Sequence, residues 1–415
     1  MRRTSRPEGR AAGSCNLSVR CSIFRTMHVA RLDLLQRLER RLRANPAVLL
    51  LGPRQCGKTT LARDFTHGRR VERFDLERPD DWQRLAQPLT TLEPLRGLVV
   101  IDEAQLMPEL FPVLRVLTDR RPLPARFLLL GSASPDLTTH VSESLAGRVA
   151  RLDMGGFELN EAGAARDRRL WWRGGFPRSY LARTEADSHE WRRDFIDTFL
   201  ERDLRRFGVQ IPAAALRRFW NMVAHYHGQV WNASEIGRSL GEAHTTVKRH
   251  LDILTGAFVM RQLPPWFENV GKRQVKSPKV YLRDSGVLHA LLGIDSFAAL
   301  ERHPKLGASW EGFALEEVLR VTGDRDAYFW STHAGAELDL LVFHRGRRYG
   351  FEFKYADAPT LTKSMHIAKA DLALDHLVVV APGTRNYPLA PWADVVGLSE
   401  LRAWLMRRLL RKKAG

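Results

Sequence analysis

One short stretch of the chain combines residue types at a spacing that suits phosphate binding. Residues 47–60 read AVLLLGPRQCGKTT and match the pattern G-x-x-x-x-G-K-[ST]. The apolar residues before the loop predict a buried parallel strand, and the residues after it are compatible with a helix. Such a strand–loop–helix directs backbone N–H groups at a phosphate chain. We expect nucleotide contacts from a continuous set of loop residues, namely Gly52, Pro53, Arg54, Gln55, Cys56, Gly57, Lys58, Thr59 and Thr60.

Two of these side chains have specific roles in the pattern. Lys58 is placed to reach the β- and γ-phosphates and to assist catalysis, and the Thr59 hydroxyl is placed to hold Mg²⁺. A second motif, GLVVIDEAQ at residues 97–105, is an apolar strand that ends in two acids. Such a strand brings Asp102 to the Mg²⁺ ion and Glu103 to a position where it polarises the attacking water. Together these residues predict a nucleotide-hydrolysing site.

Two later segments also bear on this site. The run RFLLLGSAS at residues 126–134 predicts a buried strand that ends in small polar residues. Ser132 or Ser134 is then placed to sense the γ-phosphate, and a helix or turn cap is the equal alternative. Arg148 follows a glycine in SLAGRVA and is a candidate arginine finger, in cis or across a subunit boundary. Such a finger contributes roughly 10³- to 10⁵-fold in rate, and a solvated arginine is the alternative.

The motifs GPRQCGKTT, VVIDEAQ, LLLGSAS and SLAGRVA occur in this order along the chain. In this arrangement the chain resembles the AAA-type ATPases of bacteria and archaea that carry a C-terminal domain of unknown function. The resemblance covers nearly the whole chain after Met27. It implies a five-stranded parallel core and ATP, rather than GTP, as the nucleotide. The absence of an N-K-x-D base-recognition motif from the sequence agrees with ATP.

The length and the net charge of the chain limit the possible classes of protein and of binding partner. The chain has 415 residues and a formal net charge of +18. This length predicts two or three domains, and the basic balance favours a polyanionic partner such as nucleic acid. Arginine-rich codon usage is the alternative cause of the charge. Three cysteines without metal-ligand spacing fit a reducing cytosol, and no apolar run approaches the roughly 20 residues of a membrane helix.

Shifts in composition divide the chain into five parts. The leader is rich in Arg and Ser and predicts disorder, with Met27 as the alternative start of translation. A helical, aromatic region after the P-loop domain predicts a lid. The expected boundaries are a leader at 1–26, a P-loop domain at 27–156, a helical lid at 157–212, a winged helix at 213–275 and a C-terminal domain at 276–415.

The winged-helix expectation depends on three helix-like segments followed by a strand. The third segment, EAHTTVKRHLDIL, follows a turn that contains glycine, as in a helix-turn-helix. Its exposed residues are expected to contact DNA, with Lys248 and Arg249 reaching phosphate or guanine. The alternative is that this module only packs against the nucleotide domain. The exposed set is His244, Thr245, Lys248 and Arg249.

The C-terminal domain contains a predicted β-hairpin around Arg345-Gly346. A two-residue turn there places Asp339 opposite Glu352, and Glu337 opposite Lys354. Two acids face to face repel each other unless a divalent cation or a lysine lies nearby. Carboxylate oxygens suit Mg²⁺ or Mn²⁺.

This set of residues resembles the restriction-endonuclease-like fold, whose motif is Asp, then Glu-x-Lys, with a Glu on the preceding helix. The matches are Asp339, Glu352 and Lys354, with Glu311 as the helix acid. Glu316 and Glu317 are rivals for that place. In the nuclease interpretation the carboxylates hold a metal that activates water, and Lys354 stabilises charge on the phosphate. An ordinary polar strand face and a nuclease-like fold without cleavage are the alternatives.

The expected fold class is α/β, with a parallel-sheet ATPase domain, a helical lid, a winged helix and a restriction-endonuclease-like domain. The expected activity is ATP binding with Mg²⁺ and ATP hydrolysis, coupled to a domain that acts on or near DNA. A Mg²⁺-dependent nuclease with a regulatory ATPase is one alternative. A non-catalytic, ATP-switched scaffold that binds a protein partner is another, and the oligomeric state remains open.

Overall fold

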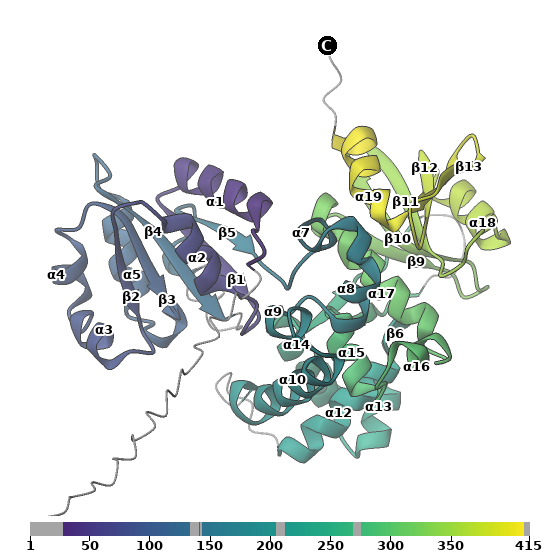
Figure 1. Cartoon of the computed structure of the whole chain (residues 1–415), viewed down its shortest axis with the longest axis horizontal. Helices are drawn as coiled ribbons and strands as arrows, with labels where there is room; N and C mark the ends of the chain where they lie inside the picture. The colour runs from purple at the N-terminus through teal and green to yellow at the C-terminus, as the bar shows by residue number, and fades with distance from the viewer. Residues whose placement is uncertain (1–27, 133–140, 142, 205–211, 269–274, 411–415) are drawn as a thin grey trace, which may run out of the picture.

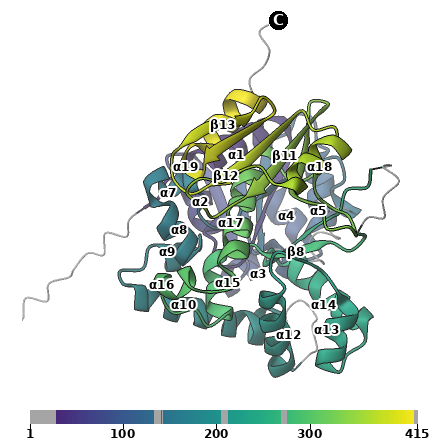
Figure 2. The same cartoon turned by 90° about the vertical axis from the view of Figure 1, so that its right-hand side faces the viewer.

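The computed structural model describes residues 28–132, 141, 143–204, 212–268 and 275–410. The predicted leader, the start at Met27 and Ser134 lie outside the described residues. Figure 1 shows the P-loop domain on one side of the molecule, with the middle and C-terminal parts on the other. In Figure 2 the C-terminal domain lies above the helices of the middle part.

The P-loop domain is built on a five-stranded sheet of order β2-β3-β4-β1-β5. All four strand pairings in it are parallel, as the resemblance implied. Strand β1 is buried along its whole length because its residues contribute to the cores on both faces of the sheet. The strands are β1 Ala47–Gly52, β2 Val71–Asp75, β3 Gly97–Asp102, β4 Ala125–Ser132 and β5 Val149–Asp153.

Helices cover both faces of this sheet. The segment DDWQRLAQPLTTLEPL forms two helices because Pro88 begins a second helix and cannot continue the first. Helix α1 carries its apolar residues Leu34, Leu38 and Leu42 at helical spacing and buries them against the sheet. The helices are α1 Leu32–Ala44, α2 Lys58–Thr66, α3 Pro79–Arg84, α4 Pro88–Leu92, η1 Ala104–Leu106 and α5 Leu110–Thr118.

The middle part is helical and shares a hydrophobic core with one face of the sheet. Val48 and Leu50 of β1 belong to the same buried cluster as Phe195, Trp220 and Leu251. Helix α10 begins at Glu185, and the chain changes to a π-helical turn after Thr198. The elements are α7 Leu159–Ala162, η2 Ala164–Arg166, α8 Asp167–Arg173, α9 Pro177–Tyr180, α10 Glu185–Thr198 and η3 Phe199–Asp203.

The next elements alternate helices with short strands. Strand β8 lies at the centre of an antiparallel sheet of order β6-β8-β7. The sequence-based boundary at 275 placed this strand in the C-terminal domain, whereas it pairs with the module before it. The elements are α12 Ala213–His225, β6 Gln229–Val230, α13 Ala233–Leu240, α14 His244–Gly256, β7 Met260–Leu263, β8 Lys279–Leu282, α15 Ser285–Leu291 and α16 Phe297–Glu301.

The C-terminal domain has a mixed sheet of order β13-β14-β12-β11-β10-β9. Its hairpin turns at Arg345 and Gly346, which have φ angles of 51° and 74°. His344 pairs with Arg347, so the described register matches the predicted two-residue turn. The elements are α17 Leu306–Thr322, β9 Ala327–Ser331, β10 Glu337–His344, β11 Arg347–Phe353, α18 Lys363–Asp371, β12 His376–Ala381, β13 Asn386–Ala390, β14 Ala393–Gly397, α19 Leu398–Leu405 and η4 Met406–Leu410.

Candidate functional site

Three predicted motifs meet at the carboxyl edge of the parallel sheet. Strand β1 ends at Gly52, β3 ends at Asp102, and β4, which lies between them, ends at Ser132. Parallel strands present their carboxyl ends at one edge, where open α/β sheets bind ligands. The sequence separates these residues widely, and the strand order brings them together.

The phosphate loop has the backbone that its glycines allow. A Cβ on Gly52 would lie 2.2 Å from the carbonyl oxygen of Met154, so no larger residue fits there. Gly57 has a φ of 98° and Gln55 a φ of 63°, both in the left-handed region. Cys56 is buried. The start of the loop therefore packs closely against Met154, the residue that follows β5.

Lys58, Thr59 and Thr60 form the first turn of α2, and Arg54 lies in the loop before it. Lys58 is buried, and its Nζ donates to the carbonyl oxygens of Gly52 at 3.2 Å and Pro53 at 3.0 Å. Arg54 pairs with Glu77 at 3.1 Å, and Thr60 is exposed on α2. The ammonium therefore lies inside the loop, where a phosphate chain binds in this motif.

Thr59 and Asp102 form the oxygen pair expected for Mg²⁺. Thr59 Oγ1 donates to Asp102 Oδ2 at 2.7 Å. Burial and, to a smaller extent, the charge of Glu103 raise the pKa of Asp102, although its hydrogen bond with Thr59 acts in the opposite direction. A hydroxyl and one carboxylate suit Mg²⁺, which takes its remaining ligands from phosphates and water. These residues therefore fit the ion that the motif implies.

Glu103 adopts an unusual backbone conformation with a φ of 53°. Its carboxylate accepts hydrogen bonds from the Gln105 side-chain amide and, at 3.3 Å, from Ser132 Oγ. Its backbone N–H donates to Asp102 Oδ1 at 3.0 Å. Non-glycine residues in this region cost free energy and cluster at functional sites. This backbone conformation directs the Glu103 carboxylate toward Ser132 on β4.

Arg148 does not reach this edge of the sheet. Its carbonyl oxygen accepts from the N–H of Ala47, at the amino end of β1, and its guanidinium pairs with Asp119 at 2.7 and 2.8 Å. The length of β1, roughly 16 Å at 3.3 Å per residue, separates it from the phosphate loop. The finger in cis is therefore not supported by the geometry, and the finger across a subunit boundary stays a prediction.

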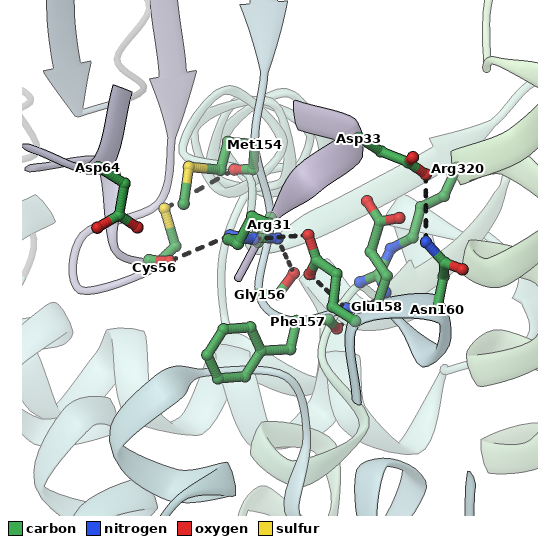
Figure 3. A network of polar contacts seen from close by, with 12 residues as sticks. Arg31, Asp33, Cys56, Asp64, Met154, Gly156, Phe157, Glu158, Asn160 and Arg320 are labelled. Atoms are coloured by element: carbon green, nitrogen blue, oxygen red, sulfur yellow. Dashed lines mark hydrogen bonds and ion pairs between the residues drawn. The ribbon is translucent and has the colours of Figure 1, made fainter. Parts of the chain in front are cut away.

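Arg31 is a residue of this site that sequence reasoning missed. Its guanidinium is buried and donates to the carbonyl oxygens of Gly155 at 3.0 Å, Gly156 at 2.8 Å and, more weakly, Cys56 at 3.5 Å (Figure 3). It also pairs with Glu161 at 2.8 Å. One side chain thus joins the phosphate loop to the segment that leaves β5. No local motif marks it, because its partners are far away in sequence.

The same segment is held from the other side by the C-terminal domain. Arg320 on α17 donates to the carbonyl oxygen of Phe157 at 3.0 Å and pairs with Glu317 at 2.6 Å. Glu317 in turn accepts from the N–H of Leu159 at 3.1 Å. The chain between β5 and α7 therefore lies between Arg31 and Arg320, as Figure 3 shows. Pro177 of α9 lies close to the phosphate loop, since a Cβ built on Gly57 would lie 3.8 Å from the Pro177 Cγ.

The C-terminal domain brings together the residues of its predicted acidic site. Lys354 Nζ lies 2.8 Å from Glu352 Oε2 and 3.9 Å from Asp339 Oδ2. The N–H of Phe353 donates to Asp339 Oδ2 at 3.1 Å. Among the three rival helix acids, Glu311 lies in this cluster. Its rivals are engaged elsewhere, Glu316 with Arg261 and Arg283 and Glu317 with Arg320.

Lys279 of β8 enters this cluster from the preceding module and was not predicted. Its buried ammonium lies 3.0 Å from Glu311 Oε1 and 3.5 Å from Asp339 Oδ1, and it also pairs with Glu337. Burial and the charge of Asp339 raise the pKa of Glu311 to about 7 and that of Glu352 to about 8. Across the described residues, no group of three or more His, Cys, Asp or Glu side chains is arranged to hold a metal ion.

The predicted DNA-contacting residues lie on the outer face of α14. His244, Thr245, Lys248 and Arg249 are exposed. Val247 and Leu251 face inward and are buried. The helix therefore presents its basic side chains away from its own core.

Three family models match successive parts of the chain. Residues 44–163 match the model of the AAA domain. Two domains of unknown function follow, DUF8612 at residues 166–298 and DUF4143 at residues 306–401. The chain therefore contains a P-loop ATPase domain of the AAA type. In the described part of the chain, no helix has the length and apolar character needed to cross a membrane.

Two mycobacterial proteins are similar over most of the chain. They are the uncharacterized proteins Rv2008c of Mycobacterium tuberculosis and Mb2031c of Mycobacterium bovis, each 54% identical over 364 residues, which cover 88% of this chain and 82% of theirs. The chain belongs to the same family as these proteins. Among solved structures, the Walker-type ATPase PABY2304 of Pyrococcus abyssi is similar with a TM-score of 0.47 and 18% identity, over 64% of this chain and 97% of that chain.

Proposed function

We propose that this chain binds ATP with Mg²⁺ and hydrolyses it. Lys58 would contact the β- and γ-phosphates, and Thr59 and Asp102 would hold the ion, which neutralises charge on the phosphates when bound. Glu103 would polarise the attacking water, and Ser132 would sense the γ-phosphate. The observation that supports this proposal best is the 2.7 Å contact between Thr59 and Asp102, because it joins the two motifs in the arrangement that Mg²⁺ requires.

Steady-state phosphate release by the full chain tests this proposal. Lys58→Ala should abolish turnover, and Arg115→Ala, an exposed arginine on α5, should leave it unchanged. ATP binding without turnover in the unchanged protein would favour the alternative of a non-catalytic switch that acts on a protein partner.

The nucleotide state is proposed to control the position of the C-terminal domain. The segment between β5 and α7 is bonded to Arg31 on the side of the phosphate loop and to Arg320 on the side of α17. A ligand that reshapes the phosphate loop would alter the Arg31 contacts first. Ordering of a loop by a nucleotide is an established physical cause of domain movement.

Binding of duplex DNA through α14 is the second candidate function. We interpret α12, α13 and α14 with the sheet β6-β8-β7 as a winged helix. The exposure of Lys248 and Arg249 on the third helix supports this role, since that helix enters the major groove in such modules. Packing against the nucleotide domain alone remains the alternative.

A metal-dependent nuclease site at Asp339 and Glu352, with Glu311 and Lys354 nearby, is the less favoured proposal. The four residues lie in one cluster, but the ammonium of Lys279 already pairs with two of its acids, Glu311 and Asp339, and with the neighbouring Glu337. The test is nicking of DNA in Mg²⁺ or Mn²⁺. Nicking that disappears in Asp339→Ala and Lys354→Ala would support cleavage, and nicking that survives both would rule out this site.

A further inference from the structure

A cleft of about 1190 Å³ lies between the P-loop domain and the C-terminal domain. Helix α1 and the end of β5 form one wall, and α17 with the residues after it forms the other. In Figure 1, α1 lies on the side of the P-loop domain that faces the C-terminal domain. Pro53 of the phosphate loop also lines the cleft. The cleft is larger than the roughly 300–1,000 Å³ of typical small-molecule sites, so it suits an extended ligand.

Three arginines of α1 line this cleft. Arg40 and Arg41 stand three and four positions after Arg37, so both lie on the helix face that carries Arg37. Within the part of the chain that the structure describes, none of their side chains has a hydrogen bond or an ion pair. Arg325 on the opposite wall is exposed and equally lacks one.

Other charges of the lining offset these arginines only in part, with Asp153 acting on Arg41 and Glu158 on Arg37. Most acidic side chains there are already paired, for example Asp33 with Arg402, Asp153 with Arg151, and Glu316 with Arg261 and Arg283. Among the acids of the lining that lack an ion pair, Asp326 is exposed, burial raises the pKa of Glu158, and Asp284 already accepts from the N–H groups of Gly175 and Val287.

The arginines of α1 act on one another electrostatically. Burial and the charges of Arg37 and Arg40 lower the pKa of Arg41, whereas the charge of Asp153 acts in the opposite direction. Like charges on one helix face destabilise the helix unless something compensates them. An anion with repeated charges would compensate all three side chains at once.

The cleft also contains an aromatic ring in an unusual backbone position. Phe258 has a φ of 61°, which is costly for a bulky residue and is found at functional sites. The guanidinium carbons of Arg151 and Arg283 lie 5.6 and 5.0 Å from its ring centroid. Aromatic rings and arginine planes are the groups on which unpaired bases stack.

We propose that this cleft binds a single-stranded nucleic acid. The phosphates follow Arg37, Arg40 and Arg41, and the bases lie toward Phe258 and its two arginines. A duplex keeps its bases inside the stack and cannot offer them to this wall. This surface is distinct from the outer face of α14, and the proposal does not depend on ATP hydrolysis.

Binding of a fluorescent oligothymidylate to the full chain, without ATP, tests the proposal by anisotropy. Charge reversal in Arg37→Glu/Arg40→Glu/Arg41→Glu should weaken binding at least about tenfold and lower the slope of log affinity against log salt by about 2, since each contact to a single strand contributes about 0.7. The matched control is Arg63→Glu/Arg96→Glu/Arg115→Glu, three exposed arginines outside the cleft. It should keep both the affinity and the slope.

Two further variants make the result decisive. Arg37→Gln/Arg40→Gln/Arg41→Gln removes the charges without adding new ones, and an unchanged thermal unfolding midpoint shows that it is folded. Lys248→Glu/Arg249→Glu tests whether α14 binds the strand instead. The proposal is overturned if the unchanged protein does not bind, if the α1 variants bind as it does, if the α14 variant alone loses binding, or if polyglutamate competes as well as the oligonucleotide.

Discussion

The hydroxyl of Thr59 donates a 2.7 Å hydrogen bond to Oδ2 of Asp102, although 43 residues separate them along the chain. The contact exists because the loop after β1 leads into α2, which carries Thr59, and β3 ends at Asp102 on the same edge of the sheet. Strand β4 lies between β1 and β3. This contact brings together the two oxygen donors that the proposed Mg²⁺ ion needs.

The Thr59–Asp102 pair predicts how hydrolysis depends on magnesium. Asp102→Asn keeps the side-chain size but removes the charge, so kcat should fall by about 100-fold or more. Thr59→Ser keeps the hydroxyl and should retain activity, whereas Thr59→Ala should require more Mg²⁺. Phosphate release measured across a Mg²⁺ titration checks this. Equal magnesium dependence in all three variants would exclude the assigned ion site.

Substitution of Arg31, which lies outside the sequence motifs, should lower the stability of the fold strongly. Its ion pair with Glu161 is buried, with side-chain exposures of 5% and 3%. Removing one partner of a buried pair costs about 3–5 kcal/mol, so Arg31→Ala should lower the free energy of unfolding by that amount. Arg43→Ala, which breaks an exposed pair with Glu39, should cost about 1 kcal/mol or less. Urea unfolding measures both.

A second readout separates positioning from stability. Arg31→Lys keeps the charge but cannot reach several carbonyl oxygens at once. Where the variant is folded, its affinity for ATP should fall because the phosphate loop loses the contact at Cys56. ATP affinity equal to that of the unchanged protein would show that Arg31 only stabilises the fold.

His227 predicts one component of the pH dependence of stability. Burial lowers its pKa to about 3 from 6.5, and the ring accepts from the N–H of Leu282 at 2.9 Å and faces the carbonyl oxygen of Ala308 at 3.1 Å. The unfolded chain therefore binds a proton that the folded chain excludes. The stabilisation is complete above pH 6.5 and is lost as the pH falls toward 3.

His227→Asn removes this titration while keeping an acceptor for Leu282. The difference in unfolding free energy between the unchanged protein and the variant should shrink by about 1.4 kcal/mol per pH unit below the unfolded pKa. Urea unfolding at neutral and mildly acidic pH measures it, and the exposed His333→Asn is the control. A difference that does not change with pH would mean that His227 is not held neutral by the fold.

The outer face of α14 predicts binding of duplex DNA. Lys248→Glu/Arg249→Glu should weaken binding uniformly across sequences and lower the salt slope by about 2, since each phosphate contact to a duplex contributes about 0.9. Anisotropy with a labelled duplex at several salt concentrations measures both quantities. If the duplex binds equally well to the variant, α14 serves to pack the module and not to read DNA.

Local motifs made much of the nucleotide site predictable. The phosphate loop and the strand that ends in Asp102 are each recognisable from a few neighbouring residues. The resemblance implied the five-stranded parallel core. The hairpin register of β10 and β11 could be derived because a two-residue turn fixes every pair after it.

Long-range contacts could not be predicted in the same way. Arg31 and Lys279 act on partners far along the chain, and a single arginine or lysine on a helix or strand has no distinguishing pattern. Arg148 looked like a finger because it follows a glycine near the domain end, yet the strand direction places it at the opposite edge of the sheet from the phosphate loop. The predicted domain boundary at residue 275 depended on composition. Strand β8 follows that boundary in the sequence but pairs with β7, which precedes it.

The most direct test of the central claim separates binding from turnover at Glu103. ATP binding and single-turnover hydrolysis should be measured for the unchanged protein, Glu103→Gln and Arg148→Ala. We predict that Glu103→Gln binds ATP with unchanged affinity but hydrolyses it at least about 100-fold more slowly, because the group that polarises the water is lost. Arg148→Ala should be unchanged in the monomer. Hydrolysis by Glu103→Gln at the rate of the unchanged protein would contradict the assigned catalytic site.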